Sequence, residues 1–445
     1  MQPPDKPMAR FFASLLKYLT AAIFVFIPLY PKFPLFFLPG SAVAIRAEDF
    51  LIATTAIVLA VHLILSKKIK LPPLGFQIIV YLAVGALSVL SAILITKNVN
   101  PLLAIFHWGR RLEYLLVFFF VYYVGRENRG SRRLLFELIL LVPIGVFLYG
   151  LAQIFAAAPV ISTMNKEFAK GIALTLQPGV QLSSTFAGHY DLAIYLAMIL
   201  AYLATLLTFK LKRRHWFGLL AGFVILLWLF TQAGSRIAIF GLVFSVALVC
   251  FLRQKFKLAL LLTALVGASI LTSPSLMMRL GNLWRVFQAQ LQSAIVVPVV
   301  HAAESTGFLT VLGDEALRPI QEDRSTSIRF DVEWPRALRS LYKNPFLGTG
   351  YSSISLATDN EYLRALGETG LLGFVAFVSI LIALFRALVS GYRLAKGDLD
   401  QAITLGALGV YAVFLISAFF LDVFEASKIA IMFWALTGLA MSTKS

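Results

Sequence analysis

The feature that most constrains this chain is its series of long apolar segments. About twelve stretches approach the roughly 20 residues that an α-helix needs to cross a bilayer. A transmembrane barrel would instead show strands of about ten residues with alternating apolar and polar side chains. The pattern therefore predicts an all-α integral membrane protein. The predicted segments are 11–30, 50–66, 74–95, 101–124, 134–157, 188–208, 216–234, 236–252, 257–272, 370–390, 401–421 and 428–442.

Composition supports this prediction and excludes several other classes of protein. Of the 445 residues, 59% are hydrophobic and 14% are charged, and the mean hydropathy is +0.84. A soluble enzyme needs more polar surface, a disordered chain is less apolar, and a disulfide scaffold is richer in cysteine. The single cysteine, Cys250, permits no intrachain disulfide, and the five histidines show no close metal-binding spacing.

The net charge of +17 is distributed as the positive-inside rule for membrane proteins predicts. If the N-terminus lies in the cytoplasm, the cytoplasmic segments hold 21 of the 39 Lys and Arg residues and 5 of the 22 acids. That side then carries +16, and the rest of the chain carries +1. We therefore expect both termini in the cytoplasm. Nucleic-acid binding is not expected, because the positive charge already has an explanation.

A long connection separates the ninth predicted span from the tenth and lies on the extracytoplasmic side in this topology. The predicted organisation is spans one to nine in residues 1–272, a long extracytoplasmic loop with short helices in 273–369, and spans ten to twelve in 370–445. Loops of this length are usually functional or disordered. We expect the second half of this loop to be ordered.

Three local patterns support order in that second half. Residues 326–342 have helical periodicity, with a kink expected at Trp334-Pro335. Residues 344–350 are rich in turn formers. Thr358-Asp359-Asn360-Glu361 has the spacing of a capping box and predicts the start of a short helix.

Charged residues within or beside the spans are the first functional candidates, because charge is costly in lipid. Arg110, Arg111 and Glu113 lie in the fourth predicted span. Arg110 and Glu113 have the spacing of a helical ion pair, so this group is either structural or a cationic pocket for an anionic headgroup. Arg236 follows Gly234 in a tight turn before the eighth span. Its guanidinium either binds phosphate or reaches toward lipid headgroups.

Side chains at the outer ends of the spans form a second group. Asp359 begins a predicted short helix and Glu368 precedes the tenth span. Either carboxylate could act as a general base, although both positions also suit helix ends. His189 and Asp191 enter the sixth span from outside. Asp191 is favourable there because of the helix dipole, and His189 by itself is more consistent with a structural role.

Together these residues permit one kind of chemistry. Arginines at the outer face could hold a diphosphate and stabilise its negative charge as it leaves. A nearby carboxylate could accept the proton of an attacking hydroxyl. This combination suits the transfer of a group from a lipid diphosphate to an alcohol.

Three motifs in a fixed order carry a resemblance to a known family. The first is Thr231-Gln232-Ala233-Gly234-Ser235-Arg236, at the start of a span. The second is Asn344-Pro345-Phe346-Leu347-Gly348-Thr349-Gly350. The third is Asp359-Asn360-Glu361-Tyr362-Leu363, followed by Glu368-Thr369-Gly370-Leu371-Leu372-Gly373. With the layout of the spans, residues 183–375 are similar to the O-antigen ligase and O-antigen polymerase superfamily.

The resemblance implies a GT-C-like glycosyltransferase of the bacterial inner membrane that needs no metal or other cofactor. Its donor would be a glycan on undecaprenyl diphosphate, and its acceptor a glycan or a lipid such as lipopolysaccharide core. Arg236 matches the family arginine thought to bind the diphosphate, Arg329 is the candidate for a second loop arginine, and Asp359 would activate the acceptor. The further substrate-binding candidates are Arg110, Arg111, His189 and Glu368.

One position departs from the family pattern. Ligases of this family commonly carry His-Asn where this chain has Asp359-Asn360, and the histidine is the proposed acceptor-activating group. An unperturbed aspartate has a pKa near 3.9 and is a weak base at neutral pH, so Asp359 would need burial to match a histidine. The departure leaves open whether the chain resembles the ligases or the polymerases in its reaction.

Two other classes of function remain open. A transporter or flippase for a lipid-linked glycan would explain Arg110 and Arg111 within a span, but such proteins commonly contain internal repeats, and none is visible here. A scaffold subunit of a glycan-assembly complex would perform no chemistry. Formation of a glycosylated product distinguishes a transferase from both.

Overall fold

The computed structural model describes residues 7–37, 44–67, 71–160, 176, 180–274, 329–354 and 358–443, with a few positions between 276 and 288. Residues 161–175, between the fifth and sixth predicted spans, and residues 289–328 of the predicted long loop lie outside the described residues.

Helices make up nearly all of the described structure, as the sequence predicts. Each of the twelve predicted apolar segments overlaps one of them. In chain order the elements are α1 (Pro7–Leu29), β1 (Pro34–Phe37), β2 (Ala44–Arg46), α2 (Ala47–Ser66), α3 (Gly75–Ser91), the π-helix η1 (Ala92–Thr96), α4 (Pro101–Glu127), α5 (Arg129–Phe155), α6 (His189–Leu207), α7 (Arg213–Gln232), α8 (Arg236–Leu252), α9 (Phe256–Ile270), the π-helix η5 (Arg329–Glu333), α12 (Trp334–Lys343), α13 (Glu361–Leu394), α14 (Asp398–Ser417) and α15 (Ser427–Met441).

Many of these helices have the length and composition of membrane spans. Eight qualify among the described residues, namely α1, α2, α3 with η1, α5, α6, α7, α13 and α14. Three shorter apolar helices, α8, α9 and α15, have 15 to 17 residues. The remaining long helix, α4, has 27 residues and carries Arg110, Arg111 and Glu113 near its middle. The fold is consistent with an integral membrane protein, while the count of twelve spans and the three-part division of the chain stay predictions.

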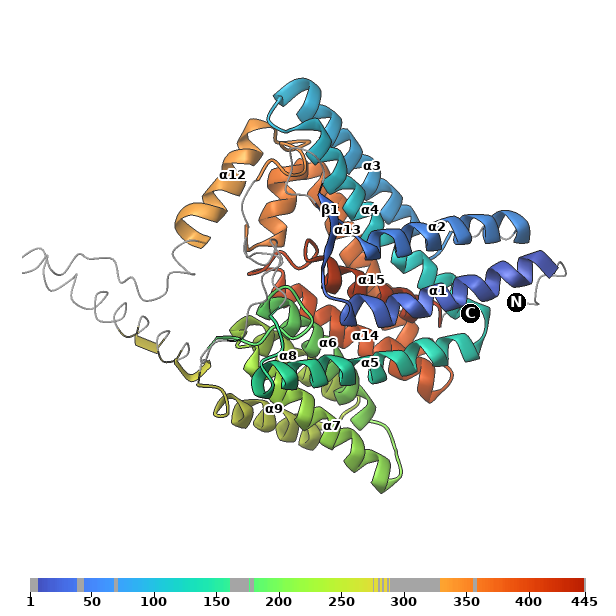
Figure 1. The fold of residues 1–445 in the computed structure, drawn as a ribbon, viewed down its shortest axis with the longest axis vertical. Helices are drawn as coiled ribbons and strands as arrows, with labels where there is room; N and C mark the ends of the chain where they lie inside the picture. The colour runs from blue at the N-terminus through green and yellow to red at the C-terminus, as the bar shows by residue number, and fades with distance from the viewer. Residues whose placement is uncertain are drawn as a thin grey trace, which may run out of the picture.

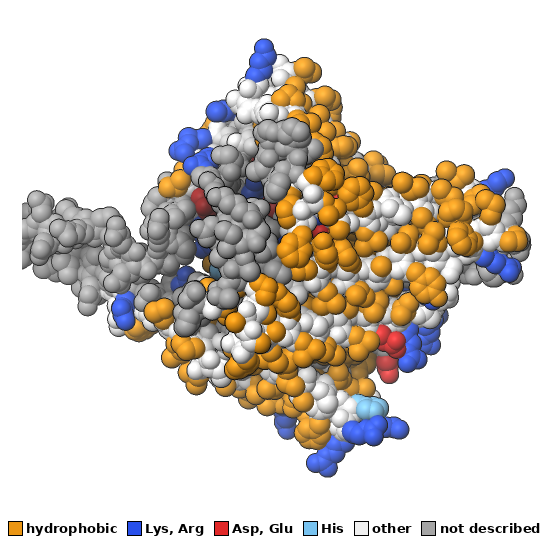
Figure 2. Space-filling view, viewed as in Figure 1, with side chains coloured by type: hydrophobic (Ala, Val, Ile, Leu, Met, Phe, Trp, Pro, Cys, Tyr) orange, Lys and Arg blue, Asp and Glu red, His pale blue; other side chains and the backbone are white. Residues whose placement is uncertain are grey.

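The bundle has two distinct ends (Figure 1). We call the end where α1 begins and α15 finishes the terminal end, because both termini lie there. The opposite end, where α6, α8 and α13 begin and α12 lies, is the loop end. Hydrophobic side chains cover much of the surface between them, and Lys and Arg side chains gather near the extremities (Figure 2). A bundle that crosses a membrane needs this surface, because apolar side chains must face the lipid.

The centre of the bundle is formed by α6, α14 and α15. In their most apolar stretches, α6 is 83% buried and α14 is 72% buried, against 22% for the peripheral α2. α14 packs against α6, α8 and α13, and α15 packs against α4. The approach of α15 to α4 is close because Gly438 lacks a side chain. A Cβ atom there would lie 2.5 Å from the carbonyl oxygen of Phe118.

A short β-hairpin connects α1 to α2 at the loop end. β1 and β2 are antiparallel, with Pro34 opposite Arg46. The hairpin holds Lys32, just before β1, and Arg46, the last residue of β2, at the same end of the bundle.

The described part of the long loop corrects one prediction. Residues 329–343 are helical as expected, but Trp334-Pro335 is not a kink within one helix. A π-helical turn, η5, precedes it, and Pro335 lies in the first turn of α12. Proline suits that position because the missing N–H has no partner there. Residues 326–328 of the predicted helix lie outside the described residues.

Candidate active site at the loop end

The backbone before α13 is held by a carboxylate from a distant part of the chain. Asp422, between α14 and α15, accepts hydrogen bonds from the N–H groups of Thr358 (2.9 Å), Asp359 (3.4 Å) and Asn360 (3.3 Å). These three donors fix the chain where Asp359 adopts a left-handed conformation, with φ of 48°. The position of Asp359 therefore depends on Asp422.

The predicted capping box at this helix is wrong. Asn360, not Thr358, is the N-cap, and its side chain accepts a hydrogen bond from the N–H of Leu363 at 3.0 Å. The Glu361 carboxylate instead accepts a hydrogen bond from the N–H of Phe424 at 3.0 Å. The α14–α15 connection thus supplies the acceptor Asp422 and the N–H donor of Phe424, and these contacts fix the backbone where α13 begins.

Asp359 and Arg329 form a direct ion pair. The Nε and Nη2 atoms of Arg329 donate to Oδ2 of Asp359 at 2.9 and 2.7 Å. Arg329 is buried, whereas 28% of the Asp359 side chain is exposed. Burial raises the pKa of Asp359, and the positive charge of Arg329 opposes that rise. The structure thus brings together the predicted base and the predicted loop arginine, which lie 30 residues apart in the sequence.

A buried charge network connects this pair with α4. Arg364 on α13 lies 2.7 Å from Asp422 and 3.3 Å from Glu425. Glu425 also pairs with Arg111. Arg111 further donates to the carbonyl oxygen of Phe424 at 2.9 Å. Because Asp422 holds the backbone of Asp359, these contacts form a continuous path from Arg111 to Asp359.

The network borders a cavity of about 350 Å³ at the loop end. Its lining residues are Lys32, Ala44, Arg46, Phe106, His107, Arg110, Tyr114, Glu425 and Ser427. Among these described lining residues Glu425 is the one acid, and three side chains are basic, namely Lys32, Arg46 and Arg110. A small cavity with several basic side chains at its lining suits an anionic group.

The acids that balance these cations stand outside the lining. Asp191 lies 3.7 Å from Lys32, and Glu48 lies 3.6 Å from Arg46. Arg110 lies 3.4 Å from Asp49 and 4.0 Å from Glu113, and it donates to the carbonyl oxygen of Ala44 at 2.7 Å. The acids orient the basic side chains but do not occupy the cavity. A bound anion would therefore meet mainly the positive groups.

The two neighbouring arginines of α4 have different environments. Arg110 lines the cavity and leaves 20% of its side chain exposed. Arg111 is buried, pairs with Glu425 and lies with its guanidinium 5.4 Å from the ring centroid of Tyr351. The predicted ion pair of Arg110 and Glu113 is present, with 4.0 Å between their charged atoms. Arg110 also lines the cavity, whereas Arg111 belongs to the buried network.

Arg236 and His189 begin two adjacent helices at the loop end. Ser235 caps α8 by accepting the N–H of Ala238 at 3.3 Å, and Gly234 has a φ of 67°, so the predicted tight turn is present. α8 packs against α6. The ring of His189, the first residue of α6, lies 4.1 Å from that of Tyr190. Asp191 in the same turn of α6 pairs with Lys32 of the cavity.

Glu368 is buried, and its contacts are structural. Its side chain is 3.6 Å from Arg364, one helical turn earlier. Its carbonyl oxygen accepts hydrogen bonds from the Ser88 hydroxyl and the Gly350 N–H, both at 2.8 Å. Asp359 is therefore better placed than Glu368 to reach a substrate hydroxyl.

Two of the sequence motifs interlock through their backbones. The N–H of Gly350 donates to Glu368 at 2.8 Å, and the N–H of Leu371 donates to Pro345 at 2.8 Å. Gly370 kinks α13 with a φ of 65°, where the sequence predicts a helix boundary. Gly348 has a φ of 66°, and a Cβ there would lie 2.5 Å from the Glu368 carbonyl. The glycines thus allow the loop motif to pack directly on α13.

This packing predicts a large loss of stability in Gly348→Ala. A side chain at this φ costs on the order of 1–3 kcal/mol, and the overlap with Glu368 adds to it. Thermal unfolding of the detergent-solubilised protein measures the effect as a lower melting temperature. The control is Gly222→Ala in α7, where an added Cβ meets nothing within 4 Å. Equal melting temperatures for Gly348→Ala and wild type would contradict this interpretation.

Sequence reasoning missed several residues of this region. Lys32 and Arg46 line the cavity, and Arg364, Asp422 and Glu425 build the network. One signal could have found them, since all five are charged residues at predicted outer ends of spans. Among the described residues, no group of three or more His, Cys, Asp or Glu side chains is arranged to hold a metal ion.

Part of the chain is similar to a known protein family. A family model described as O-antigen ligase matches residues 221–378. No curated protein matches the sequence. The matched segment contains Arg236, Arg329 and Asp359, and it confirms the resemblance that the motifs predict. Together with the apolar helices, it supports a bacterial membrane enzyme of the O-antigen ligase or polymerase type that acts in surface polysaccharide biosynthesis.

Proposed function

We propose that this chain transfers a glycan from undecaprenyl diphosphate to an acceptor hydroxyl at the loop end, on the outer face of the bacterial cytoplasmic membrane. The family match supports this general reaction. The observation that carries the proposal is the continuous path of charged groups between a cationic cavity and Asp359, through Glu425, Arg364 and Asp422.

The distribution of charge supports the orientation. Basic clusters in the α6–α7 connection and the α8–α9 turn lie at the terminal end, with both chain termini (Figure 1). The positive-inside rule assigns that end to the cytoplasm. The loop end then faces outward, where a lipid-linked glycan and its acceptor would meet.

The cavity is the proposed site for the donor diphosphate. Lys32, Arg46 and Arg110 would contact its oxygen atoms and stabilise the negative charge that develops on the leaving group. Burial lowers the pKa of Lys32, and Asp191 opposes that shift. A bound phosphate would favour the charged amine further, because opposite charges stabilise each other. Arg236, at the start of α8, is proposed to contact the donor from the α6–α8 side.

Asp359 is the proposed general base. The acceptor oxygen attacks the anomeric carbon of the donor sugar and forms the new C–O bond. The bond between that carbon and the phosphate oxygen breaks, and undecaprenyl diphosphate leaves with its electron pair. The acceptor proton passes to the carboxylate of Asp359. Burial makes Asp359 a stronger base than an exposed aspartate, because it raises the pKa of the carboxyl group.

The ion pair predicts how activity depends on pH. Transfer requires ionised Asp359, so the rate falls as pH drops through its pKa. Removing Arg329 removes the charge that opposes the burial effect, and the pKa rises further. On a plot of kcat/KM against pH, the acid limb is the fall in rate at low pH. In Arg329→Met this limb should move to higher pH by about one unit or more.

Two controls isolate the charge of Arg329. Arg329→Lys keeps a cation and should leave the acid limb close to that of the wild type. Arg339→Met removes an exposed arginine from the neighbouring helix α12 and should have no effect. An unchanged acid limb in Arg329→Met would show that Asp359 is not the group whose ionisation controls the rate.

A reconstitution experiment separates transfer from transport. Purified protein in proteoliposomes receives a diphosphate-linked glycan in the leaflet that faces the loop end, together with a candidate acceptor. A transferase forms a glycosylated acceptor there. A flippase moves the intact donor to the other leaflet without forming product, and that result would overturn the proposal. A scaffold does neither.

A further inference from the structure

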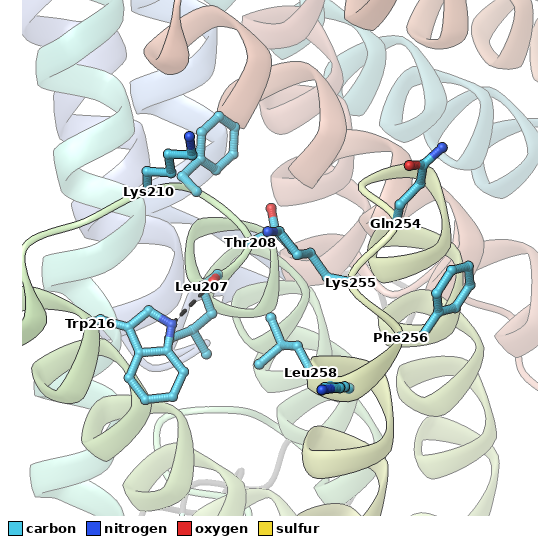
Figure 3. Close-up of a pocket in the computed structure, with 10 residues that line it drawn as sticks. Leu207, Thr208, Lys210, Trp216, Gln254, Lys255, Phe256 and Leu258 are labelled. Carbon is cyan, nitrogen blue, oxygen red and sulfur yellow. Dashed lines mark hydrogen bonds between the residues drawn. The ribbon is translucent and has the colours of Figure 1, made fainter.

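A second cavity, of about 570 Å³, lies at the terminal end, away from the proposed active site. It is bordered by the α6–α7 connection on one side and by the α8–α9 turn on the other. Figure 3 shows Lys210 and Trp216 on the first side and Lys255 and Phe256 on the second. Gln254 adopts a left-handed conformation with φ of 53° in that turn, which reverses the chain at the rim.

The rim is strongly basic. Lys210, Lys255 and Lys257 all line the cavity and are exposed. The sequence contains no Asp or Glu between Asp191 and Glu304, so neither bordering segment can neutralise these lysines. From α14, the nearby Asp400 is 3.2 Å from Arg132. The cavity therefore presents three cations to any ligand that enters it.

The floor of the cavity is apolar and rigidly held. Leu207 and Phe209 are buried, and Leu258 is half-buried. The indole N–H of Trp216 donates to the carbonyl oxygen of Leu207 at 3.2 Å, which fixes the ring at the rim. Arg253 stacks on Phe209, with its guanidinium 4.3 Å from the ring centroid. A tryptophan with an apolar body and a bonded N–H is typical of a membrane interface.

The outer flank of the cavity continues into an apolar surface. Phe256 is 61% exposed and Leu260, one turn further along α9, is 73% exposed. A ligand with a charged head at the lysines and a hydrocarbon tail along α9 would match both surfaces. Neither a free anion nor a soluble peptide would use the exposed side of α9.

We infer that this cavity binds the phosphate headgroup of an anionic phospholipid in the leaflet at the terminal end, with its acyl chains along α9. Three lysines supply the charge complementarity, since basic pockets between membrane helices bind anionic headgroups. The apolar floor receives the glycerol region, and Trp216 marks the depth of the interface. The site is independent of the proposed transfer reaction, whose cavity lies at the opposite end.

The test measures lipid binding to purified protein by native mass spectrometry, with phosphatidylglycerol, phosphatidylcholine and inorganic phosphate as separate probes. Wild type should bind phosphatidylglycerol more tightly than phosphatidylcholine. The triple variant Lys210→Gln, Lys255→Gln, Lys257→Gln should weaken phosphatidylglycerol binding on the order of a hundredfold. Leu258→Trp fills the floor without changing charge and should weaken it as well.

A matched variant distinguishes the cavity from general attraction between charges. Lys67, Arg386 and Lys396 are exposed at the same end, and their triple replacement by Gln removes equal charge outside the cavity. This control should bind phosphatidylglycerol like the wild type. Equal losses in both triple variants, or unchanged binding in Leu258→Trp, would overturn the proposed site. If inorganic phosphate binds to wild type and the cavity triple variant loses that binding, the cavity is a site for a free anion, and the lipid proposal is overturned.

Discussion

Replacing Asp359 with asparagine should lower kcat for glycan transfer by about 10²–10⁴-fold, the usual contribution of a general base. Asparagine has nearly the same shape, but its amide cannot take up the proton of the attacking hydroxyl. The donor site should remain intact, because Asp422 binds the backbone N–H of Asp359 and not its side chain. The expected result is a slow enzyme with a nearly normal KM for the donor.

Initial rates with purified protein measure this effect, and donor saturation curves separate kcat from KM. Asp398→Asn is the matched control, because Asp398 is an exposed acid at the terminal end. It should transfer glycan at the wild-type rate. A variant Asp359→Asn that keeps more than about a tenth of the wild-type kcat has lost less than about tenfold, which is too little for the loss of a general base. In that case another group must accept the proton.

The second large effect concerns the cationic cavity. The double variant Lys32→Gln, Arg110→Gln should weaken donor binding by at least about a hundredfold, because each charged hydrogen bond contributes about 1.5–3 kcal/mol. The loss should appear as a higher KM for the diphosphate-linked donor. Replacement of Arg339 and Lys343 by Gln, on exposed positions of α12 at the same end, should leave KM unchanged.

Removing these cations also leaves Asp191 and Asp49 without their ion partners, so stability must be measured beside KM. The charge-conserving variant Lys32→Arg, Arg110→Lys addresses this directly, because it keeps both positive charges. It should retain most of the donor affinity. A wild-type KM in a folded Lys32→Gln, Arg110→Gln variant would exclude the cavity as the donor site.

The helices could be predicted from the sequence, because their signals are local, and local signals also named the main site candidates. A run of about 20 apolar residues indicates a helix that can cross a bilayer, whatever the rest of the chain does. Arginines within a span, such as Arg110, are costly in lipid and therefore conspicuous. Arg236 and Asp359 belong to motifs that are contiguous in the sequence, and both lie within the segment that the O-antigen ligase family model matches.

The cavity and the network could not be predicted, because their contacts join distant parts of the chain. Arg364 and Asp422 are 58 residues apart, and Arg111 and Phe424 are 313 residues apart. No local periodicity specifies such a pairing. The start of α13 is a second example. Thr358 and Glu361 have the spacing of a capping box, but the Asp422 carboxylate accepts the N–H of Thr358 and the N–H of Phe424 donates to Glu361, so the box does not form.

The glycine motifs illustrate a third case. Their turn-forming composition predicted a turn at 344–350, which the structure contains. A glycine is needed at position 348 because of a tertiary contact, since the backbone of Glu368 leaves no room there for a side chain. A sequence can therefore indicate that the chain turns without showing which partner requires the glycine.

The most direct test of the central claim is the stoichiometry of the reaction catalysed by the purified wild-type protein. With a glycan on undecaprenyl diphosphate as donor and a hydroxyl-bearing acceptor, we expect the release of one undecaprenyl diphosphate for each glycosylated acceptor that forms. Cleavage of the donor without glycosylated acceptor, or an intact donor after many hours with every acceptor tested, would contradict it.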